Sequence, residues 1–310
     1  MQKRRIIDCH SHFGEDVFYP LDGDMQEYIK QTKNLGITDC FAMSVPCPKL
    51  EKKETIVKPA IFKLNKENQI IGHVCETESN NVVCERPLNE GEDPYYESNM
   101  NLLHQIRKER DIHFHFVPLL HPYFYSEKNM IKYISQGAVA FKIHGFSSGV
   151  HPKDIKLDFF RVLEKLNIPI IVHTDASNNY GFAGNNAPMN WINSIKDFNI
   201  KVFFAHAGRL NSEFIKVVNN DSRYIVGMAP DALISSDKKR LDVDVDNYIK
   251  KFFDSYNENK VVFDIDYPWN VNNWESKDLD WGFLDRIKNI CQERNLEKYL
   301  KSNAEEFFNV

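Results

Sequence analysis

The stretch Arg5-Ile-Ile-Asp-Cys-His-Ser-His-Phe13 combines an apolar pair with two histidines one residue apart. Side chains alternate along a β-strand, so His10 and His12 are expected on the same face, about 7 Å apart. Two imidazoles at that spacing can hold one metal ion. The same pair also fits an ordinary polar strand end, so a metal site is predicted only if other strand ends carry matching residues.

Apolar, strand-like runs alternate with helix-like segments along most of the chain. The eight strands are expected at residues 5–9, 37–45, 112–119, 138–144, 168–173, 201–206, 224–228 and 260–265. Their nearly continuous apolar character is typical of parallel strands buried on both faces. Eight such units predict one α/β domain over residues 1–310, a (β/α)8 TIM barrel. An open doubly wound sheet is the alternative, but no Gly-x-Gly-x-x-Gly motif follows the first strand.

One segment after the second strand departs from this alternation. Residues 50–67 are charged and predict a helix. Residues 69–77 and 82–84 are strand-like and flank the polar centre Ser79-Asn80-Asn81. This pattern predicts a β-hairpin inserted after the second strand, at about residues 69–86.

Composition narrows the class of protein and its partners. The chain has 310 residues, of which 42% are hydrophobic and 27% charged, and its formal net charge is −5. A negative net charge argues against nucleic acid or an anionic membrane as the main partner. No apolar run approaches the ~18 residues of a transmembrane helix, and no apolar segment typical of a signal peptide follows the basic start. The six cysteines form no Cys-x-x-Cys motif, which favours reduced thiols in a cytoplasmic protein.

Candidate site residues stand at the ends of the expected strands, which meet at one mouth of a barrel. Besides His10 and His12, they are Lys142 and His144 on the fourth strand, His173 on the fifth, His206 on the sixth and Asp266 on the eighth. One histidine at such a position is usually structural. Four of these histidines, His10, His12, His173 and His206, and Asp266 are spread over four strands, which is hard to attribute to chance, so we predict one shared site.

These motifs resemble the amidohydrolase superfamily, specifically its branch of amidohydrolase-related TIM-barrel proteins that includes carboxymuconate-semialdehyde decarboxylase-like enzymes. The matching motifs are Ile7-Asp-Cys-His-Ser-His12, Lys142-Ile-His144, Pro169-Ile-Ile-Val-His-Thr174, Ala205-His-Ala-Gly208, Asp266-Tyr-Pro268 and Ser302-Asn-Ala-Glu-Glu-Phe-Phe308. The resemblance spans nearly the whole chain and is specific for the fold and the metal site, not for the substrate. The chain departs from the branch in the inserted hairpin and in Asp264, where the branch often has glycine.

The resemblance implies that His10, His12, His173 and Asp266 hold one divalent metal ion. His206 would lie outside them and hydrogen-bond a bound water or the substrate. Nitrogen and carboxylate donors suit Zn²⁺, and also Mn²⁺ or Fe²⁺. Such a site keeps a position for water, whose pKa a divalent metal lowers from ~15.7 toward ~7. Asp266 would accept the proton of that water and pass it to the leaving group.

Three residues are candidates for substrate binding: Lys142, His144 and, less directly, Arg209. Lys142 has three interpretations: a carboxylated lysine that bridges two metal ions, a lysine that faces the substrate, or a lysine whose amino group reaches solvent at the rim. Arg209 either clamps a substrate carboxylate or lies on the surface. His144 would share the face of Lys142.

Two further groups are interpreted more cautiously. His113, His115 and His121 lie on or just after the third expected strand, and because no carboxylate accompanies them in the sequence we interpret them as mostly structural. Aromatic residues of the loops are candidates for the walls of a substrate pocket: Phe146, Tyr180, Phe182, Trp191, Trp269 and Trp274.

The sequence therefore predicts a metal-dependent hydrolase that attacks an amide, ester or lactone bond of a small-molecule substrate. The alternative enzyme is a metal-dependent nonoxidative decarboxylase of a small unsaturated or aromatic carboxylic acid. A metal-stabilised barrel that binds a ligand without turnover is a third hypothesis. A homo-oligomer is compatible with all three.

Overall fold

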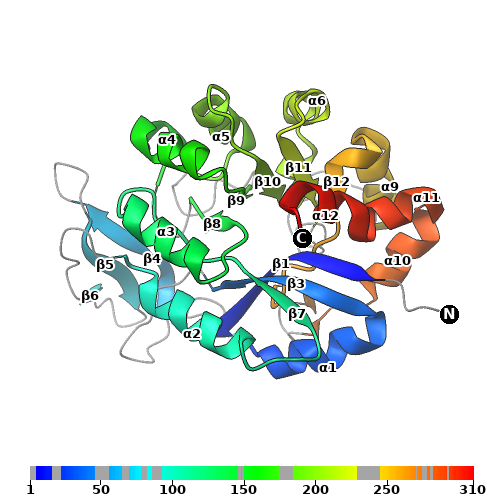
Figure 1. Cartoon of the computed structure of the whole chain (residues 1–310), viewed down its shortest axis with the longest axis horizontal. Helices are drawn as coiled ribbons and strands as arrows, with labels where there is room; N and C mark the ends of the chain where they lie inside the picture. Colours follow the sequence, from blue (N-terminus) through cyan, green and yellow to red (C-terminus); the bar gives the residue numbers. More distant parts are fainter. Residues whose placement is uncertain are drawn as a thin grey trace.

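The computed structural model describes residues 5–15, 22–45, 56–64, 70–77, 82–85, 93–145, 148, 150–174, 184–228, 245–269, 271–273, 278–279, 282–291 and 293–310. Two mainly parallel sheets form the centre of the molecule, and helices surround them (Figure 1). The first sheet has the order β2-β1-β3-β7, with bounds β1 Ile6–Glu15, β2 Asp22–Gly23, β3 Ile37–Ser44 and β7 His113–Phe116. The second has the order β12-β11-β10-β9-β8, with bounds β8 Phe141–Ile143, β9 Ile170–His173, β10 Val202–Ala205, β11 Tyr224–Gly227 and β12 Val261–Val262.

The two sheets meet at two seams, where isolated bridges replace continuous ladders. At one seam, parallel bridges pair Phe116 with Ala138 and Leu119 with Lys142. At the other, Ser11 pairs with Tyr267, and the backbone N–H of Asp266 donates to the carbonyl oxygen of His10 over 2.7 Å. The eight expected strands are thus present in the order of a (β/α)8 barrel, and the predicted fold is confirmed.

Helices follow the strands around the outside of this barrel. Their bounds are α1 Met25–Leu35, α2 Tyr96–Ile106, α3 Glu127–Ser135, α4 Leu157–Leu166, α5 Pro188–Ile195, α6 Ser212–Asn220, α9 Val245–Ser255, α10 Phe283–Ile290, α11 Glu293–Glu297 and α12 Asn303–Phe308. A short antiparallel pair, β13 (Val271–Asn273) and β14 (Asp278–Leu279), lies between the last strand and α10. None of the described helices has the length and apolar character that a membrane crossing needs.

The segment after β3 differs from its prediction. The expected helix at 50–67 is wrong, because Ile56–Leu64 forms the strand β4. Pro59 lies inside it, and proline would remove a helical hydrogen bond but is tolerated in an edge strand. β4 pairs with β5 (Ile70–Thr77), which pairs with β6 (Val82–Glu85) in the expected hairpin, so the insertion is a three-stranded antiparallel sheet.

A β-bulge in β1 decides which way the first strand presents its side chains. Asp8 pairs with Cys40 of β3 and Ser11 pairs with Ala42, so three steps along β1 match two along β3. A bulge of this kind shifts the alternation of side chains by one residue. Ile7, before the bulge, and His12, after it, therefore both face the barrel interior although they are an odd number of residues apart.

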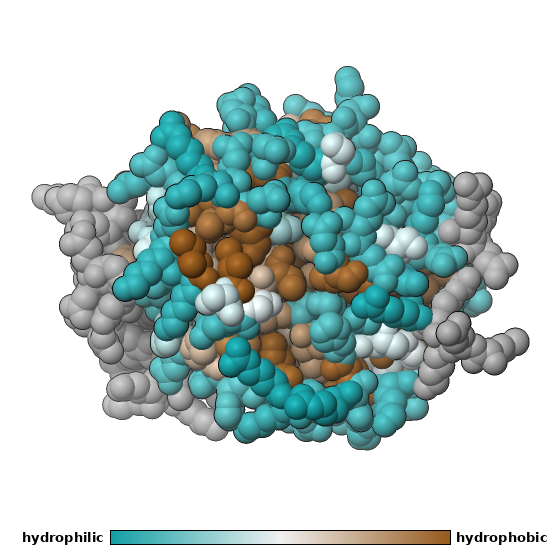
Figure 2. All heavy atoms as spheres, in the orientation of Figure 1, coloured by the Kyte–Doolittle hydropathy of each residue, from teal (hydrophilic) through white to brown (hydrophobic). Residues whose placement is uncertain are grey.

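The barrel interior is filled by one apolar cluster that α12 completes. The cluster consists of Ile7, Cys9, Phe41, Met43, Val117, Ala140, Ile171, Phe203, Ile225 and Val262 from the strands, with Ala304, Phe307 and Phe308 from α12. Figure 1 shows α12 lying across the centre of the barrel next to the C-terminus. On this face hydrophobic residues gather toward the middle, inside a ring of hydrophilic ones (Figure 2).

Phe308 packs against aromatic rings of two strands at this end of the barrel. Its ring lies 4.3 Å from Phe41 and 6.2 Å from Phe203, measured between centroids. We expect Phe308→Ala to lower the free energy of unfolding by about 3–5 kcal/mol, because it leaves a cavity in the interior. Urea unfolding measures this loss. Ile131→Ala is the control: Ile131 is 48% exposed, so its loss should stay within about 0.5 kcal/mol. Equal losses in the two variants would contradict the packing role of α12.

Candidate metal centre

The structure brings the predicted site residues together at the C-terminal ends of the strands. His10 and His12 come from β1, Lys142 from β8, His173 from the end of β9, His206 from the first residue after β10 and Asp266 from the segment after β12. Lys142 and His10 are fully buried, and His12, His206 and Asp266 expose no more than 4% of their surface. Ionisable groups at this depth are costly unless they meet each other or a metal ion.

The donor atoms lie at separations that suit a small divalent ion. Nε2 of His12 lies 3.0 Å from Nε2 of His10 and 3.8 Å from Oδ1 of Asp266. Nδ1 of His10 lies 3.3 Å from the same Asp266 oxygen. Tetrahedral Zn–N bonds of ~2.0–2.1 Å would place ligand atoms roughly 3.3 Å apart. With Nε2 of His10 as its donor, the 3.0 Å and 3.8 Å separations from Nε2 of His12 lie on either side of that value. Nδ1 of His10 cannot bind the same ion as well, because an imidazole gives one ion only one of its two nitrogens.

His206 approaches the second oxygen of the same carboxylate, and His173 lies beside His206. Nε2 of His206 lies 3.7 Å from Oδ2 of Asp266 and 3.0 Å from Nδ1 of His173. One donor atom each from His10, His206 and Asp266 lie within 4.8 Å of one another. His206 is therefore as near to Asp266 as His12 is. The spacing of the motifs in the sequence does not predict this equal distance.

A backbone carbonyl determines the tautomer of His12. Nδ1 of His12 lies 2.9 Å from the carbonyl oxygen of Ser44, which can only accept a hydrogen bond. Nδ1 therefore carries the proton in neutral His12, and Nε2 offers its lone pair toward His10. Metal-binding histidines typically donate their other ring N–H to such a carbonyl.

The imidazoles of the site are held neutral. Burial lowers the pKa of His10 and His12 well below 6.5, and the charge of Lys142 lowers it further. Burial also lowers the pKa of His173 well below 6.5. Nδ1 of His10 is buried without a hydrogen bond, which a polar atom rarely tolerates unless another partner completes the site. Neutral imidazoles beside one carboxylate are what a divalent metal requires, so the described residues fit such an ion.

Backbone conformation also marks the site. His206 and Asp266 have φ values of 65° and 58°, in the left-handed region that residues other than glycine seldom adopt. Residues held in this region cost free energy and cluster at functional sites. Both side chains are thus aimed into the site at the expense of local backbone strain.

Lys142 lies inside the site and not at its rim. Its Nζ atom is 2.7 Å from Nε2 of His10, and the residue has no exposed surface. Burial lowers the pKa of Lys142 to about 7, although Asp266 and Asp264 act to raise it. The interpretation as a lysine that reaches solvent is therefore wrong.

His144 stacks on His173 with ring centroids 4.1 Å apart, and burial lowers the pKa of His144 to about 3.

The remaining candidates are placed only in part. The Arg209 side chain, with Phe146, Tyr180, Phe182 and Trp274, lies outside the described residues. Trp269 packs edge-on against His12 with ring centroids 4.8 Å apart, which suits a wall of the site. Trp191 is fully buried in the outer core between helix and barrel, so it is not part of a pocket wall.

Asp264 is a buried carboxylate whose place in the site the sequence did not indicate. Oδ2 of Asp264 lies 3.9 Å from Nδ1 of His10. A Cβ atom on Gly227 of β11 would overlap this carboxylate and lie 2.7 Å from Cζ of Phe203. Glycine at 227 thus makes room for the aspartate, and the two positions form a matched pair.

We expect Gly227→Ala to lower the free energy of unfolding by about 1–3 kcal/mol, because it overpacks the interior. The loss should be smaller when Asp264 is also replaced by alanine, since the larger part of the overlap is then removed. Urea unfolding of both single variants and the double variant measures this coupling. An identical cost of Gly227→Ala in the two backgrounds would show that the positions are independent.

A family model described as amidohydrolase matches residues 126–310, more than half of the chain. No curated protein matches the sequence. Similar solved structures share the fold at low identity.

One similar solved structure is that of a Pseudomonas putida protein assigned as a 2-pyrone-4,6-dicarboxylic acid hydrolase. It has 9% sequence identity and a TM-score of 0.61, and the match covers 98% of this chain and 97% of that one. A dihydroorotase from Campylobacter jejuni has 14% identity, a TM-score of 0.54 and coverage of 98% and 83%. An enamidase has 11% identity, a TM-score of 0.62 and coverage of 98% and 67%.

Proposed function

Because the chain belongs to the amidohydrolase family of enzymes, we propose that it hydrolyses an amide, ester or lactone bond of a small molecule with metal-activated water. The observation that carries this proposal is the donor set at the barrel mouth. His12 presents an Nε2 lone pair 3.0 Å from His10 and 3.8 Å from the Asp266 carboxylate. Neutral imidazoles beside a carboxylate are suited to bind a divalent ion and to leave a position for water.

In this proposal, His10, His12, His173 and Asp266 hold one divalent ion, with Zn²⁺ as the first choice. When bound, the ion supplies Lewis acidity and makes water acidic enough to ionise near neutral pH. Asp266 accepts the proton of the attacking water and returns it to the leaving group. His206, 3.7 Å from Oδ2 of Asp266, hydrogen-bonds the water or the reacting oxygen of the substrate.

Lys142 keeps two roles in the proposal, as a substrate contact or as a carboxylated bridge between two ions. Its low pKa, about 7 because of burial, leaves a substantial share of neutral amine at neutral pH. Only a neutral amine reacts with CO2 to form a carbamate, so both roles remain chemically open. Arg209 is proposed as a clamp for a substrate carboxylate, because a guanidinium can bind that group through two parallel hydrogen bonds.

The first test is metal content. After dialysis against metal-free buffer, we expect one tightly held divalent ion per chain, and none in the His10→Ala/His12→Ala variant. Elemental analysis of protein grown in defined medium measures both. Two tightly held ions that are both lost in this variant, together with a carbamate carbon signal on Lys142, would reject the one-ion assignment.

The second test separates holding the ion from moving the proton. Asparagine resembles Asp266 in shape and still offers an oxygen to a metal, but it accepts no proton at neutral pH. Asp266→Asn should keep at least part of the metal and lower kcat by on the order of 10²–10⁴. His206→Asn should keep the full metal content and lower kcat less. Normal turnover of Asp266→Asn at full metal occupancy would exclude Asp266 as the base.

The substrate screen decides between hydrolysis and decarboxylation. Metal-loaded enzyme is assayed on lactones, amides and esters, and for CO2 release from small unsaturated or aromatic carboxylic acids. CO2 release without hydrolysis would replace the proposal by the decarboxylase.

A further inference from the structure

A second group of metal-type donors lies at the opposite end of the barrel. Asp39 stands near the start of β3, and His113 and His115 stand on β7, where Asp39 pairs with His113 in the register of the two strands. From the sequence no carboxylate was expected beside these histidines, and that expectation is wrong. The carboxylate comes from the neighbouring strand, 74 positions earlier than His113 along the chain.

The three side chains already converge on one point. Oδ1 of Asp39 lies 3.1 Å from Nε2 of His115 and 3.5 Å from Nδ1 of His113. One donor atom from each residue lies within 4.8 Å of the other two. The side chains of Asp39 and His115 are 4% and 5% exposed, and that of His113 is 70% exposed. The group therefore combines two preformed buried ligands with a third that reaches solvent.

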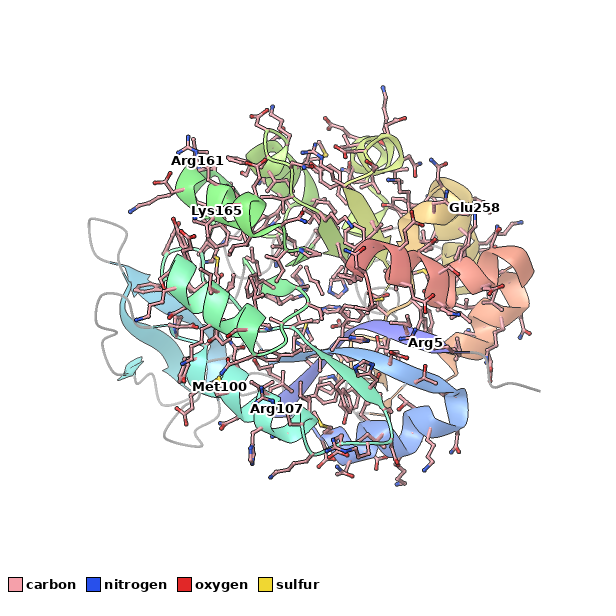
Figure 3. All side chains as sticks on the ribbon, in the orientation of Figure 1. Arg5, Met100, Arg107, Arg161, Lys165 and Glu258 are labelled. Carbon is pink, nitrogen blue, oxygen red and sulfur yellow. The ribbon has the colours of Figure 1, made fainter. Side chains whose placement is uncertain are left out.

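The local charge also admits a cation. Arg5 donates from Nε to Oδ2 of Asp39 over 2.8 Å and from NH2 to Oδ1 over 2.5 Å, and it also donates to Glu305 of α12. Figure 3 shows Arg5 between the β1–β3 strands and the C-terminal helices. Lys301 lies 3.8 Å from Glu305, so Arg5 and Lys301 balance the charges of the two carboxylates and the group carries no net positive charge. A carboxylate has about four lone-pair positions, so Asp39 can bind Arg5 and an ion together.

Asp39 is ionised under all ordinary conditions. Burial alone would raise its pKa, but hydrogen bonds from Arg5, His115 and Thr38 outweigh burial and hold the pKa well below its usual range. A ligand that is already deprotonated has no proton to release when an ion binds. His115 would exchange the hydrogen bond between its Nε2 and Asp39 for a bond to the ion.

We propose that Asp39, His113 and His115 form an accessory site for a divalent transition-metal ion of the Zn²⁺ type, at the N-terminal end of the barrel. Two imidazoles and one carboxylate favour Zn²⁺ and similar ions over Mg²⁺ or Ca²⁺, which prefer oxygen ligands alone. The bound ion links β3 to β7 and so stabilises the folded chain, because the ligands are separated in the unfolded chain. Arg5 weakens this site by its positive charge, so the ion is held less tightly than at the mouth.

The test is equilibrium dialysis against Zn²⁺, with each site removed in turn. The wild-type protein should bind a second, weaker ion besides the one at the mouth. His113→Ala should weaken the second ion at least tenfold and leave the first, and this exposed residue can be replaced without harm to the core. His10→Ala/His12→Ala should lose the first ion and keep the second. His104→Ala in α2, also an exposed histidine, is the control and should change neither.

Arg5 provides a test of opposite sign. Arg5→Gln should increase the affinity for the second ion severalfold, because a competing cation is removed. Zn²⁺ should also raise the Tm of this variant more than that of the wild type.

A second ion that survives His113→Ala and disappears with His10→Ala/His12→Ala belongs to the mouth and would overturn the accessory site. Binding of a single ion by the wild type at all Zn²⁺ concentrations would overturn it too. Neither result bears on the proposed hydrolysis, which depends on the mouth alone.

Discussion

The carboxylate of Asp8 is the interaction on which the site depends. It accepts hydrogen bonds from the backbone N–H groups of His10 and Ile265 and from the hydroxyls of Ser11 and Tyr28. These donors come from β1, within its bulge and directly after it, from the segment that leads to Asp266 and from α1. Burial raises the pKa of Asp8 to about 6 despite the hydrogen bonds, which act to lower it. An unsatisfied carboxylate at this depth would be costly, so the four donors are held where they are.

The mouth concentrates ionisable groups that the fold keeps away from water. Three imidazoles there are neutral because burial lowers their pKa values, and the same effect brings Lys142 down to about 7. Asp266 lies among them with a strained backbone. Neutral imidazoles around one carboxylate give a site that is poor in positive charge until a cation enters. The mouth therefore offers a divalent ion uncharged nitrogen donors and a negatively charged oxygen donor.

The two ends of the barrel have different chemistry. The C-terminal end carries the donors of the mouth, whereas the N-terminal end is filled by Phe307 and Phe308 and tied by Arg5 to Asp39 and Glu305. In (β/α)8 barrels, catalysis occurs at the first end and the second contributes stability. An accessory ion at Asp39 would add to the second role without entering the first.

The sequence by itself determined the eight strands, the hairpin and, apart from Asp264, the residues that meet at the mouth. These follow from local patterns: runs of apolar residues, and histidines or aspartate where each run ends. The charge pattern of residues 50–67 predicted a helix, although Pro59 argued against one, and pairing with β5 made Ile56–Leu64 the strand β4. The sequence predicted that His10 and His12 share a face, but only the bulge against β3 turned that face into the barrel. The burial of Lys142, the tautomer of His12 and the meeting of Asp39 with two histidines were decided by tertiary structure. Each depends on contacts between strands that are far apart in the chain. A local sequence pattern does not predict which distant strand will lie beside a given side chain.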